Sequence, residues 1–546
     1  MRRRCLIIGY HEIDFSMVET LAKAKGTSSA EYGIFQRDHL KIDGLSLPYF
    51  DALSHLINKG AGGVNDDNWY HITEVPNLAA VFLTSYLCER GCEADFISYL
   101  PAELDCFENQ LQSGELLAIA ITTTFYVTPF PVSDICGKAR LINSEVPIIV
   151  GGPLITNMYH DMTPEQFSFA LDEMGADIYV VEDQGEKTLL RLLNVLKSGQ
   201  EVAVVPNCFI REHGTFVYTG KEKENNALNE IVVNWDHFRD DQLGPTVQMR
   251  TARSCAFSCN FCDYPIRAGA LSLADVDVVE KELRQLHRRG VKNVVFIDDT
   301  FNIPARRFQD LCKMMIRNNF NFSWFSYFRC GNIRSTETYD LLKESGCAGV
   351  FLGIESADDI VLGNMNKGAN SKQYYYGIEQ LNKRGIASFA SFITGFPGET
   401  EHSIRNNIDF INNSGPTFFR AEPFWYNHRS PVRKLAEKFG LEGDGYRWRH
   451  HTMDVRGATR SVDRMFGEVR NSIWMPMFMF DFWALPYLLG KGMRLDELCT
   501  FLTIGQRALA LTDDPTQYRE HIGDLERFCR TLVIQPAKYK YTSRLV

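Results

Sequence analysis

The sequence lacks the features that direct a chain to a membrane, to secretion or to a nucleic acid. It has no Lys/Arg-rich run and a formal net charge of −10 over 546 residues, which disfavours extended contact with a nucleic-acid backbone. The apolar run after the basic start is too short for a secretory signal. The most apolar stretch, 474–489, contains Asp481 and two prolines and is too interrupted to span a bilayer. We therefore expect a cytoplasmic protein with neither a membrane nor a nucleic-acid partner.

A disulfide framework is also absent, because the 14 cysteines are spread along a long chain. Three of them are the exception: Cys255, Cys259 and Cys262 are separated by three and then two residues, and the next cysteine is Cys312. Thiolates bind iron and zinc, and a cubane iron–sulfur cluster is usually held by four cysteines. Three thiolates would leave one iron open to a small molecule. A zinc site with a distant fourth ligand and three buried thiols are the alternatives.

The spacing Cys-x3-Cys-x2-Cys, with Phe261 directly before the third cysteine, resembles the signature of radical S-adenosylmethionine (SAM) enzymes. The resemblance implies a [4Fe-4S] cluster held by Cys255, Cys259 and Cys262, with SAM on the open iron through its amino and carboxylate groups. Phe261 would carry the adenine through its backbone. An external electron donor such as flavodoxin or ferredoxin would reduce the cluster.

Strands and helices alternate regularly around and after the cysteine loop. Six strand–helix steps between residues 245 and 426 predict a partial (β/α)6 barrel of parallel strands. Sites in such barrels lie at the C-terminal ends of the strands. The expected strands are 247–251, 294–298, 322–329, 349–355, 387–394 and 418–425. Polar residues gather at their ends: Asp298, Asp299, Arg329, Glu355, Ser356 and Glu399. Helix caps and structural ion pairs are the alternative roles of the acidic residues.

Two segments of this predicted barrel extend the resemblance to radical SAM enzymes. Gly353-Ile-Glu355-Ser356 is similar to the segment that meets the ribose and methionine parts of SAM. Residues 395–400, Gly-Phe-Pro-Gly-Glu-Thr, are similar to the Gly-x-Pro-Gly-Glu-Thr segment of several subfamilies. Arg329, at the end of its strand, is suited to a two-pronged pair with the SAM carboxylate. The predicted SAM contacts are therefore Phe261, Arg329, Gly353, Glu355 and Ser356.

The N-terminal part of the chain shows the same alternation. Residues 1–235 predict a doubly wound, Rossmann-like parallel sheet, interrupted by an irregular insertion at about 26–75 with glycine-rich (60–63) and Asn/Asp-rich (65–68) stretches. Ligands of such sheets bind beyond the carboxyl ends of the strands, where glycines let the backbone approach and a helix N-terminus suits polar groups such as a nucleotide tail. The candidates in these loops are Thr122, Thr123, Thr124, Gly151, Gly152, Gly185 and Glu186. Ordinary turn chemistry is the alternative for each.

The order of these loops ahead of the three cysteines resembles the cobalamin-binding domain of cobalamin-dependent radical SAM enzymes, over about residues 76–200. The resemblance implies cobalamin, as methylcobalamin, as a further cofactor. The sequence contains no Asp-x-His-x-x-Gly motif, so a protein histidine as the lower axial ligand of cobalt is not supported.

The last part of the chain, 427–546, breaks the alternation and is rich in aromatic residues and Met. We expect a mostly helical domain that caps the barrel and its substrate, after a barrel at 245–426. Tyr446, Trp448, His450 and His451 are the candidate substrate contacts. An aromatic stripe of this kind also suits a plain hydrophobic core, and the neighbouring Arg/His cluster suits either an anionic substrate or a solvated face.

Three further segments, 296–302, 350–356 and 448–454, make the chain resemble the subgroup named for the phosphinate P-methyltransferase of phosphinothricin-type pathways. The resemblance implies a class B radical SAM methyltransferase. Such an enzyme moves a methyl group from SAM through methylcobalamin to an unactivated carbon or a phosphinate phosphorus of a small molecule, in natural-product biosynthesis. The alternatives are a non-methylating rearrangement or cyclisation, a methylthiotransferase, and a cofactor sensor without turnover. No protein residue is assigned a catalytic role.

Overall fold

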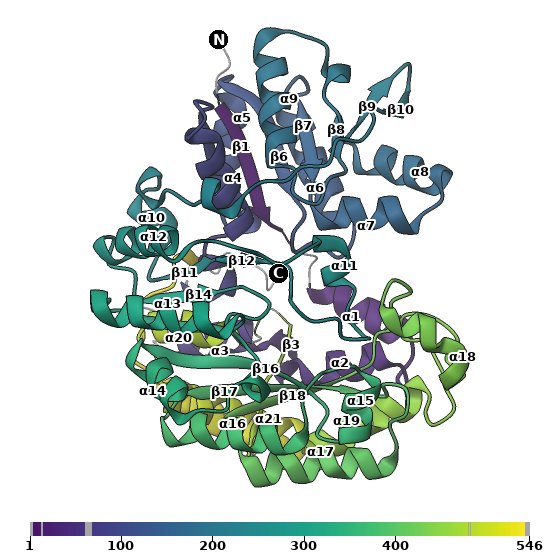
Figure 1. The fold of residues 1–546 in the computed structure, drawn as a ribbon, viewed down its shortest axis with the longest axis vertical. Helices are drawn as coiled ribbons and strands as arrows, with labels where there is room; N and C mark the ends of the chain where they lie inside the picture. Colours follow the sequence, from purple (N-terminus) through teal and green to yellow (C-terminus); the bar gives the residue numbers. More distant parts are fainter. Residues whose placement is uncertain (1–3, 12–14, 61–67, 479, 481, 541–546) are drawn as a thin grey trace. The chain divides into compact units, whose positions relative to one another are not determined.

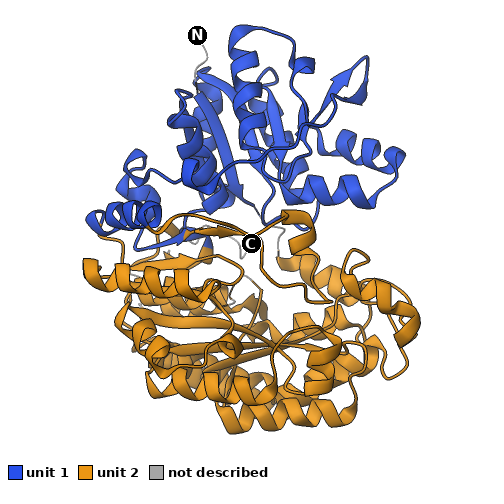
Figure 2. Cartoon of the chain, in the orientation of Figure 1, with its two compact units in different colours: residues 1–14, 73–248, 277–289 blue, residues 15–72, 249–276, 290–546 orange. Residues whose placement is uncertain are grey.

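The computed structural model of the chain describes residues 4–11, 15–60, 68–478, 480 and 482–540 (Figure 1). The chain is divided into two compact units (Figure 2). Unit 1 comprises residues 1–14, 73–248 and 277–289, and unit 2 comprises 15–72, 249–276 and 290–546. Both are built from strands and helices around a largely parallel sheet, which confirms the predicted α/β class.

Unit 1 contains a seven-stranded sheet in the order β10-β9-β8-β7-β6-β1-β5. Its strands are β1 (Arg4–Tyr10), β5 (Ala94–Tyr99), β6 (Leu116–Thr122), β7 (Ile148–Gly151), β8 (Ile178–Val180), β9 (Cys208–Glu212) and β10 (Thr215–Tyr218). The first five are parallel, as the predicted doubly wound sheet requires, whereas β9 and β10 add an antiparallel hairpin at one edge. The chain reverses its direction of winding between β1 and β6, and ligands of doubly wound sheets bind outside the carboxyl ends at that point.

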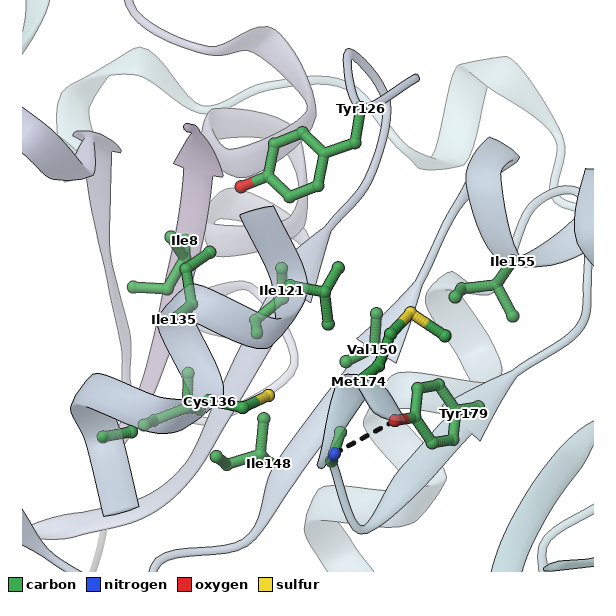
Figure 3. Close-up of a cluster of buried hydrophobic side chains, with 14 of the residues drawn as sticks. Ile8, Ile121, Tyr126, Ile135, Cys136, Ile148, Val150, Ile155, Met174 and Tyr179 are labelled. Atoms are coloured by element: carbon green, nitrogen blue, oxygen red, sulfur yellow. Dashed lines mark hydrogen bonds between the residues drawn. The ribbon is translucent and has the colours of Figure 1, made fainter. Parts of the chain in front are cut away.

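The helices of unit 1 form two packed groups, as a doubly wound sheet requires. One group is α4 (Leu78–Cys88) with α9 (Glu186–Ser198), and the other is α5 (Leu104–Gln112), α6 (Phe130–Ile142), α7 (Pro153–Asp161) and α8 (Pro164–Met174). The second group buries a continuous core that includes Ile8, Ile121, Ile135 and Val150 (Figure 3). Helix α8 was not predicted, although Thr163 and Gln166 form a capping box at its start. Two further helices are α10 (Asp240–Leu243) and α12 (Val276–Arg288).

The second seven-stranded sheet has the order β11-β14-β15-β16-β17-β18-β19. Its strands are β11 (Thr246–Met249), β14 (Asn293–Phe296), β15 (Ser323–Phe328), β16 (Cys347–Glu355), β17 (Ala387–Thr394), β18 (Phe418–Pro423) and β19 (Ile473–Trp474). The first six are the six strands that the sequence predicts, and every pairing from β14 to β19 is parallel. Among the described residues β11 and β19 are the two ends of the order, so the sheet is open, as in a partial barrel.

One face of this sheet is covered by helices and the other is partly accessible. The connecting helices are α13 (Ala305–Asn318), α14 (Thr336–Glu344), α15 (Asp359–Asn364), α16 (Ser371–Lys383) and α17 (Glu401–Ser414). Phe392 of β17 packs on Phe410 of α17 and is buried. On the opposite face six residues are half-buried: Tyr327, Phe351, Gly353, Ser391, Ile393 and Glu422. We call this second face the inner face of the sheet.

Residues 15–72, which include most of the irregular insertion predicted at about 26–75, lie in unit 2, and their described part is largely regular. They form α1 (Phe15–Ala24), α2 (Ala30–Arg37), the hairpin β2 (His39–Ile42) and β3 (Leu45–Pro48), α3 (Tyr49–Gly60) and β4 (Asn68–Trp69). The expectation of irregular structure is therefore wrong for the described part. Buried residues at helical spacing, such as Phe50, Leu53 and Leu56 in α3, outweigh the short glycine- and Asn-rich flank. That flank, 61–67, lies outside the described residues.

The C-terminal part is mostly helical, as expected. It contains α18 (Ala436–Phe439), α19 (Val455–Glu468), α20 (Ala484–Gly490), α21 (Leu495–Leu509), α22 (Pro515–Cys529) and the short β20 (Tyr539–Lys540). It packs on the early segment: α22 contacts α3, and β20 pairs with β4. Phe482 packs on Phe325, Phe351 and Phe389 and fills one end of the inner face. Among the described helices, none is both long and apolar enough to cross a membrane.

Candidate cofactor site

The three cysteines lie on one loop of unit 2, between β12 (Ala252–Arg253) and α11 (Tyr264–Ala268). β12 is held in a short antiparallel pair with β13 (Ser272–Leu273). Cys259 is buried, and Cys255 and Cys262 are partly accessible. Burial raises the pKa of the Cys262 thiol, and nearby negative charge on Cys259 and Cys255 raises it further. The three thiols therefore share one electrostatic environment.

In the part of the chain that the structure describes, no three His, Cys, Asp or Glu side chains are grouped to hold a single metal ion. A cubane cluster makes a different demand, because each thiolate binds its own iron at a separate corner. Three thiols on one partly accessible loop suit that arrangement.

Asp298, one of the polar residues predicted at a strand end, anchors the start of this loop. Its carboxylate accepts hydrogen bonds from the backbone N–H of Thr251 at 2.6 Å and of Ala252 at 2.9 Å. The side chain is 1 % exposed, and burial raises the pKa of Asp298. Asp298 thus fixes the chain that leads into the cysteines. Burial also raises the pKa of the adjacent Asp299, to about 6.

A second support comes from the end of α15 and the residue that follows it. Asn260, between the second and third cysteines, donates its N–H to Met365 O at 2.8 Å and its side-chain amide to Asn364 O at 2.7 Å. Asn364 in turn donates to Pro397 O at 3.1 Å. The segment 395–400, predicted from its resemblance, therefore braces the cysteine loop through Asn364. Its Glu399 is buried, accepts from the N–H of Gly395 and from Asn407, and has its pKa raised to about 8 by burial.

Beside the cysteines lies a buried group of charged side chains from three elements. Arg329, directly after β15, has its guanidinium carbon 3.6 Å from the centroid of the Phe257 ring. Its Nη1 lies 3.9 Å from Cys259 Sγ. Its Nη2 donates to Lys367 O. Lys367 Nζ lies 2.9 Å from Glu355 Oε1 and 5.5 Å from the Phe261 ring centroid. The structure thus brings together three predicted SAM residues, Phe261, Arg329 and Glu355, around a lysine that sequence reasoning missed.

Two backbone features shape this group. Glu355 has φ of +64°, a left-handed conformation that a non-glycine residue adopts at a cost of about 1–3 kcal/mol and that turns the end of β16. A side chain at Gly353 would collide with Glu355 and Lys367, so glycine keeps the space beside these two groups open. Ser356, the last predicted SAM residue, is fully buried, and its hydroxyl bonds Asn407 Oδ1 at 3.3 Å. That geometry gives Ser356 a supporting place behind the site.

In unit 1 the predicted loops meet at the carboxyl ends of β6 and β7. Thr123 donates its N–H to Gly151 O at 2.9 Å and accepts from Leu154 N at 3.2 Å. Gly152 has φ of +110°, and a side chain there would press on Thr123. Thr122 and Thr124 share a hydroxyl contact at 3.0 Å, and Thr124 is exposed. Thr123 and the two glycines therefore set the shape of this edge, and Thr124 faces outward.

At the end of β8, polar groups of the protein already occupy the start of α9. Glu224 accepts from the N–H of Lys187 at 3.0 Å and of Thr188 at 2.8 Å. The Glu186 carboxylate accepts from Asn226 at 2.6 Å. Gly185, with φ of +75°, makes the turn that precedes the helix. These helix N–H groups serve an internal carboxylate in this structure.

Sequence reasoning also missed an apolar surface beside the β1–β6 switch point. Phe125, Val127 and Phe130 follow β6 and are 55 %, 86 % and 60 % exposed. Phe125 packs on Tyr10 at the end of β1, with ring centroids 5.1 Å apart. Exposed apolar groups gathered in one place mark a ligand or interaction surface. A local signal existed in Thr-Thr-Thr-Phe-Tyr-Val, where large apolar residues follow the strand without a break.

The four predicted substrate residues divide into two kinds. Trp448 is 1 % exposed, donates to Phe424 O at 2.6 Å and stacks on His450. His450 bonds Gly395 O at 3.0 Å. Trp448 lies in a buried hydrophobic cluster with Phe396 and Phe424, which is the core role that the sequence left open, and the buried His450 packs against it. His451 is exposed, and Tyr446 is half-buried against Trp425.

Comparison with known families bears directly on the cysteine loop. The model of the radical SAM superfamily matches residues 249–411, which contain the three cysteines, Arg329, Glu355 and Lys367. Residues 249–411 form a radical SAM domain. Members of this superfamily carry a [4Fe-4S] cluster and bind SAM, and the three thiols with the adjoining buried cations fit both groups.

Individual relatives extend the likeness beyond this domain. An uncharacterised methyltransferase of Pyrococcus horikoshii is 28% identical over 304 residues, which is 54% of this chain and 63% of that protein. The anaerobic magnesium-protoporphyrin IX monomethyl ester cyclase of Rubrivivax gelatinosus is 24% identical over 51% of each chain. The chain thus spans between half and two thirds of the length of these curated relatives. The structure of the radical SAM methyltransferase TsrM from Kitasatospora setae, with cobalamin and a [4Fe-4S] cluster bound, has the same fold: TM-score 0.56, 15% identity, 97% of this chain and 99% of that one.

Proposed function

We propose that the chain is a class B, cobalamin-dependent radical SAM methyltransferase that acts on a small molecule. The observation that carries the proposal is the cysteine loop with Arg329 and Lys367 beside it, inside a radical SAM domain that follows a doubly wound sheet. When bound, the cluster and SAM would supply a 5′-deoxyadenosyl radical, and methylcobalamin the methyl group. The protein's own contribution is to bind, orient and exclude water.

The residues of unit 2 have distinct tasks in this proposal. Cys255, Cys259 and Cys262 would hold the cluster. Lys367 pairs with the Glu355 carboxylate, and Arg329 is a second buried cation that donates to Lys367 O. The one surplus positive charge of this group suits the carboxylate of SAM. Glu355 and the space kept by Gly353 suit the ribose and methionine parts. The Phe261 ring, close to Lys367, closes one side of the same space.

Cobalamin would bind at the carboxyl edge of the sheet of unit 1. The exposed Phe125, Val127 and Phe130 offer an apolar surface for a corrin ring, and the predicted residues Thr122, Thr123, Thr124, Gly151, Gly152, Gly185 and Glu186 shape the neighbouring loops. The imidazole Nε2 of His11, directly after β1, lies 2.8 Å from Asp134 Oδ2. This side chain is therefore already bonded within the protein. The same proposal includes an external electron donor such as flavodoxin or ferredoxin. It also includes a carbon or phosphinate phosphorus as the acceptor atom and a place in natural-product biosynthesis.

The test is product analysis of the anaerobically reconstituted protein with cobalamin, a low-potential reductant, SAM and candidate acceptors. A methyltransferase of this class forms 5′-deoxyadenosine and S-adenosylhomocysteine in near-equal amounts. The likeness to a cyclase supports a second candidate, a non-methylating radical reaction, which forms no S-adenosylhomocysteine tied to turnover. Full turnover by cobalamin-free protein would overturn the cobalamin part, and no nucleoside product under any condition would overturn both candidates.

A further inference from the structure

A second buried group of charges lies on the inner face of the sheet of unit 2. Arg420 of β18 makes a two-pronged pair with Asp38, at 2.6 and 3.2 Å, and also pairs with Glu422. Arg37, at the end of α2, pairs with Asp463 of α19. The guanidinium carbons of Arg420 and Arg37 lie 4.6 and 5.8 Å from the Trp474 ring centroid. We call Arg37, Asp38, Arg420 and Glu422 the charge group.

Several polar atoms of the charge group lack partners. Within the described part of the chain, no hydrogen bond is made by Arg37 Nε, Arg37 Nη2 or Glu422 Oε2, although all three atoms are buried. Arg37 is 6 % exposed as a residue. A buried polar atom without a partner costs about 1–3 kcal/mol, and native proteins pair nearly all of them. The missing partners are two acceptors for Arg37 and one donor for Glu422.

The position of the charge group connects it to the cofactor site. Gly353 of β16 is in register with Ser391 of β17, and Ser391 with Arg420 of β18. These three residues form one row on the inner face, and Gly353 borders Glu355 and Lys367. Neighbouring strands lie about 5 Å apart, so Arg420 lies about 10 Å from the start of the proposed SAM site. Gly353 and Ser391 of this row, and Glu422 one step on, are half-buried residues.

The charges of the group predict the charges of its ligand. It contains two cations, Arg37 and Arg420, and two anions, Asp38 and Glu422, while Asp463 is 59 % exposed at its margin. The edge of a guanidinium suits two oxygens of a carboxylate or phosphorus oxyacid. Burial raises the pKa of Glu422 in spite of Arg420, so its carboxylate gains from a further positive partner. Tyr446 lies near this carboxylate, because burial and then the charge of Glu422 raise the pKa of Tyr446.

We infer that the charge group binds the acceptor substrate, and that this substrate is a zwitterion with an oxyanion on Arg37 and an ammonium group on Glu422. The inference rests on the proposed function only where it calls the ligand the acceptor substrate. The binding site itself is inferred from the unpartnered atoms of the charge group. A net-neutral ligand supplies both missing acceptors and the missing donor and keeps the charge of the group balanced. The scaffold of the ligand between its two charges would lie along the row that leads to Gly353.

The experiment is a binding series by calorimetry and ligand-observed NMR on the full-length, cluster-reconstituted protein without SAM. The zwitterionic probes are β-alanine and 2-aminoethylphosphonate, which separate a carboxylate from a phosphorus oxyanion. The singly charged probes are propionate, ethylphosphonate and propylamine. At least one zwitterion is expected to bind ten or more times more tightly than each singly charged probe. Equal or weaker binding of both zwitterions would overturn the inference.

Variants sharpen the assignment of each charge. Arg37→Gln is expected to lose at least tenfold in zwitterion affinity and to shift preference towards propylamine, and Glu422→Gln to shift it towards the anions. Arg37→Lys keeps the charge and is expected to retain folding while losing the two-pronged contact. Arg494→Gln, at a side chain 66 % exposed, is the matched control and should bind as wild type. Identical affinities in Arg37→Gln, Arg37→Lys and the control would contradict the site. If a variant does not fold, the wild-type series decides alone.

The outcomes separate this inference from the proposed function. Zwitterion binding without any SAM cleavage would leave the site in place and remove the function. SAM cleavage by a protein that binds no zwitterion would do the reverse.

Discussion

The ammonium nitrogen of Lys367 lies 2.9 Å from Oε1 of Glu355, and these residues are only 5 % and 9 % exposed. The pair joins the end of β16 to the segment after α15, and the same segment accepts hydrogen bonds from Asn260 of the cysteine loop. One buried ion pair therefore links the proposed SAM pocket to the proposed cluster loop.

Lys367→Met should weaken SAM binding at least tenfold, which is about 1.4 kcal/mol, because a cation beside the SAM carboxylate is lost. It should also lower the free energy of unfolding by about 3–5 kcal/mol, since Glu355 is left buried and unpaired. Equilibrium dialysis with SAM and chemical denaturation measure the two effects. Lys383→Met is the control, because Lys383 and Glu379 form an exposed pair, 59 % and 58 % accessible, worth at most about 1 kcal/mol. SAM affinity equal to that of the control would remove Lys367 from the pocket.

Asn260→Ala should loosen the cysteine loop without removing a proposed cluster ligand. Its side-chain hydrogen bond to Asn364 O contributes about 1 kcal/mol, so the reconstituted variant should lose its cluster to a chelator several times faster than wild type. The decay of the visible absorbance measures that rate. Asn382→Ala removes comparable side-chain bonds to Ser414 O and Gly415 O away from the loop. A chelation rate that does not exceed this control's would show that Asn260 plays no part in holding the cluster.

Glu399 should make folding stability depend on pH. Burial raises the pKa of Glu399 from its ordinary value of 4.5 to about 8, so the folded state holds the proton more tightly than the unfolded chain. Its contribution is fully present below about pH 4.5 and is lost as the pH rises towards 8, by about 1.4 kcal/mol per unit. Denaturation between pH 5 and 8 should show a steeper fall in wild type than in Glu399→Gln, whatever the absolute stability of the variant. Parallel slopes for the two proteins would argue against a protonated Glu399.

Phe125→Ser should reduce the cobalamin retained after reconstitution and desalting, because it removes apolar area from the proposed corrin surface. The SAM affinity and cluster content should remain those of wild type. Phe169→Ser, in α8 of the same unit and 66 % exposed, controls for the loss of a surface phenylalanine. Cobalamin retention that is equal in the two variants would move the corrin site elsewhere.

The sequence was sufficient for the parts of the fold in which local pattern and burial agree. The strands from β14 to β18 are short apolar runs between amphipathic helices, and each was placed within a few residues. The three cysteines, Arg329 and Glu355 could be proposed from the sequence because their spacing or their position at a strand end is itself a signal.

Other features were hidden because they depend on contacts between distant segments. Lys367 lies in Asn-Met-Asn-Lys-Gly-Ala-Asn, which is typical of a surface loop, and its burial follows only from Glu355. Arg37 pairs with Asp463, 426 residues away, and Asp38 pairs with Arg420, 382 residues away. No local sequence pattern contains such pairs. The helix start at Glu186 looked available for a ligand because Glu224, which caps it, follows 38 residues later.

The most direct test of the central claim is the EPR spectrum of the anaerobically reconstituted and reduced protein, recorded with and without SAM and compared with Cys259→Ser. The account predicts a reduced [4Fe-4S] signal that changes shape when SAM is added and that is lost in the variant. A protein that binds zinc instead of iron, or a cluster signal that SAM leaves unchanged, would contradict an open iron held by Cys255, Cys259 and Cys262.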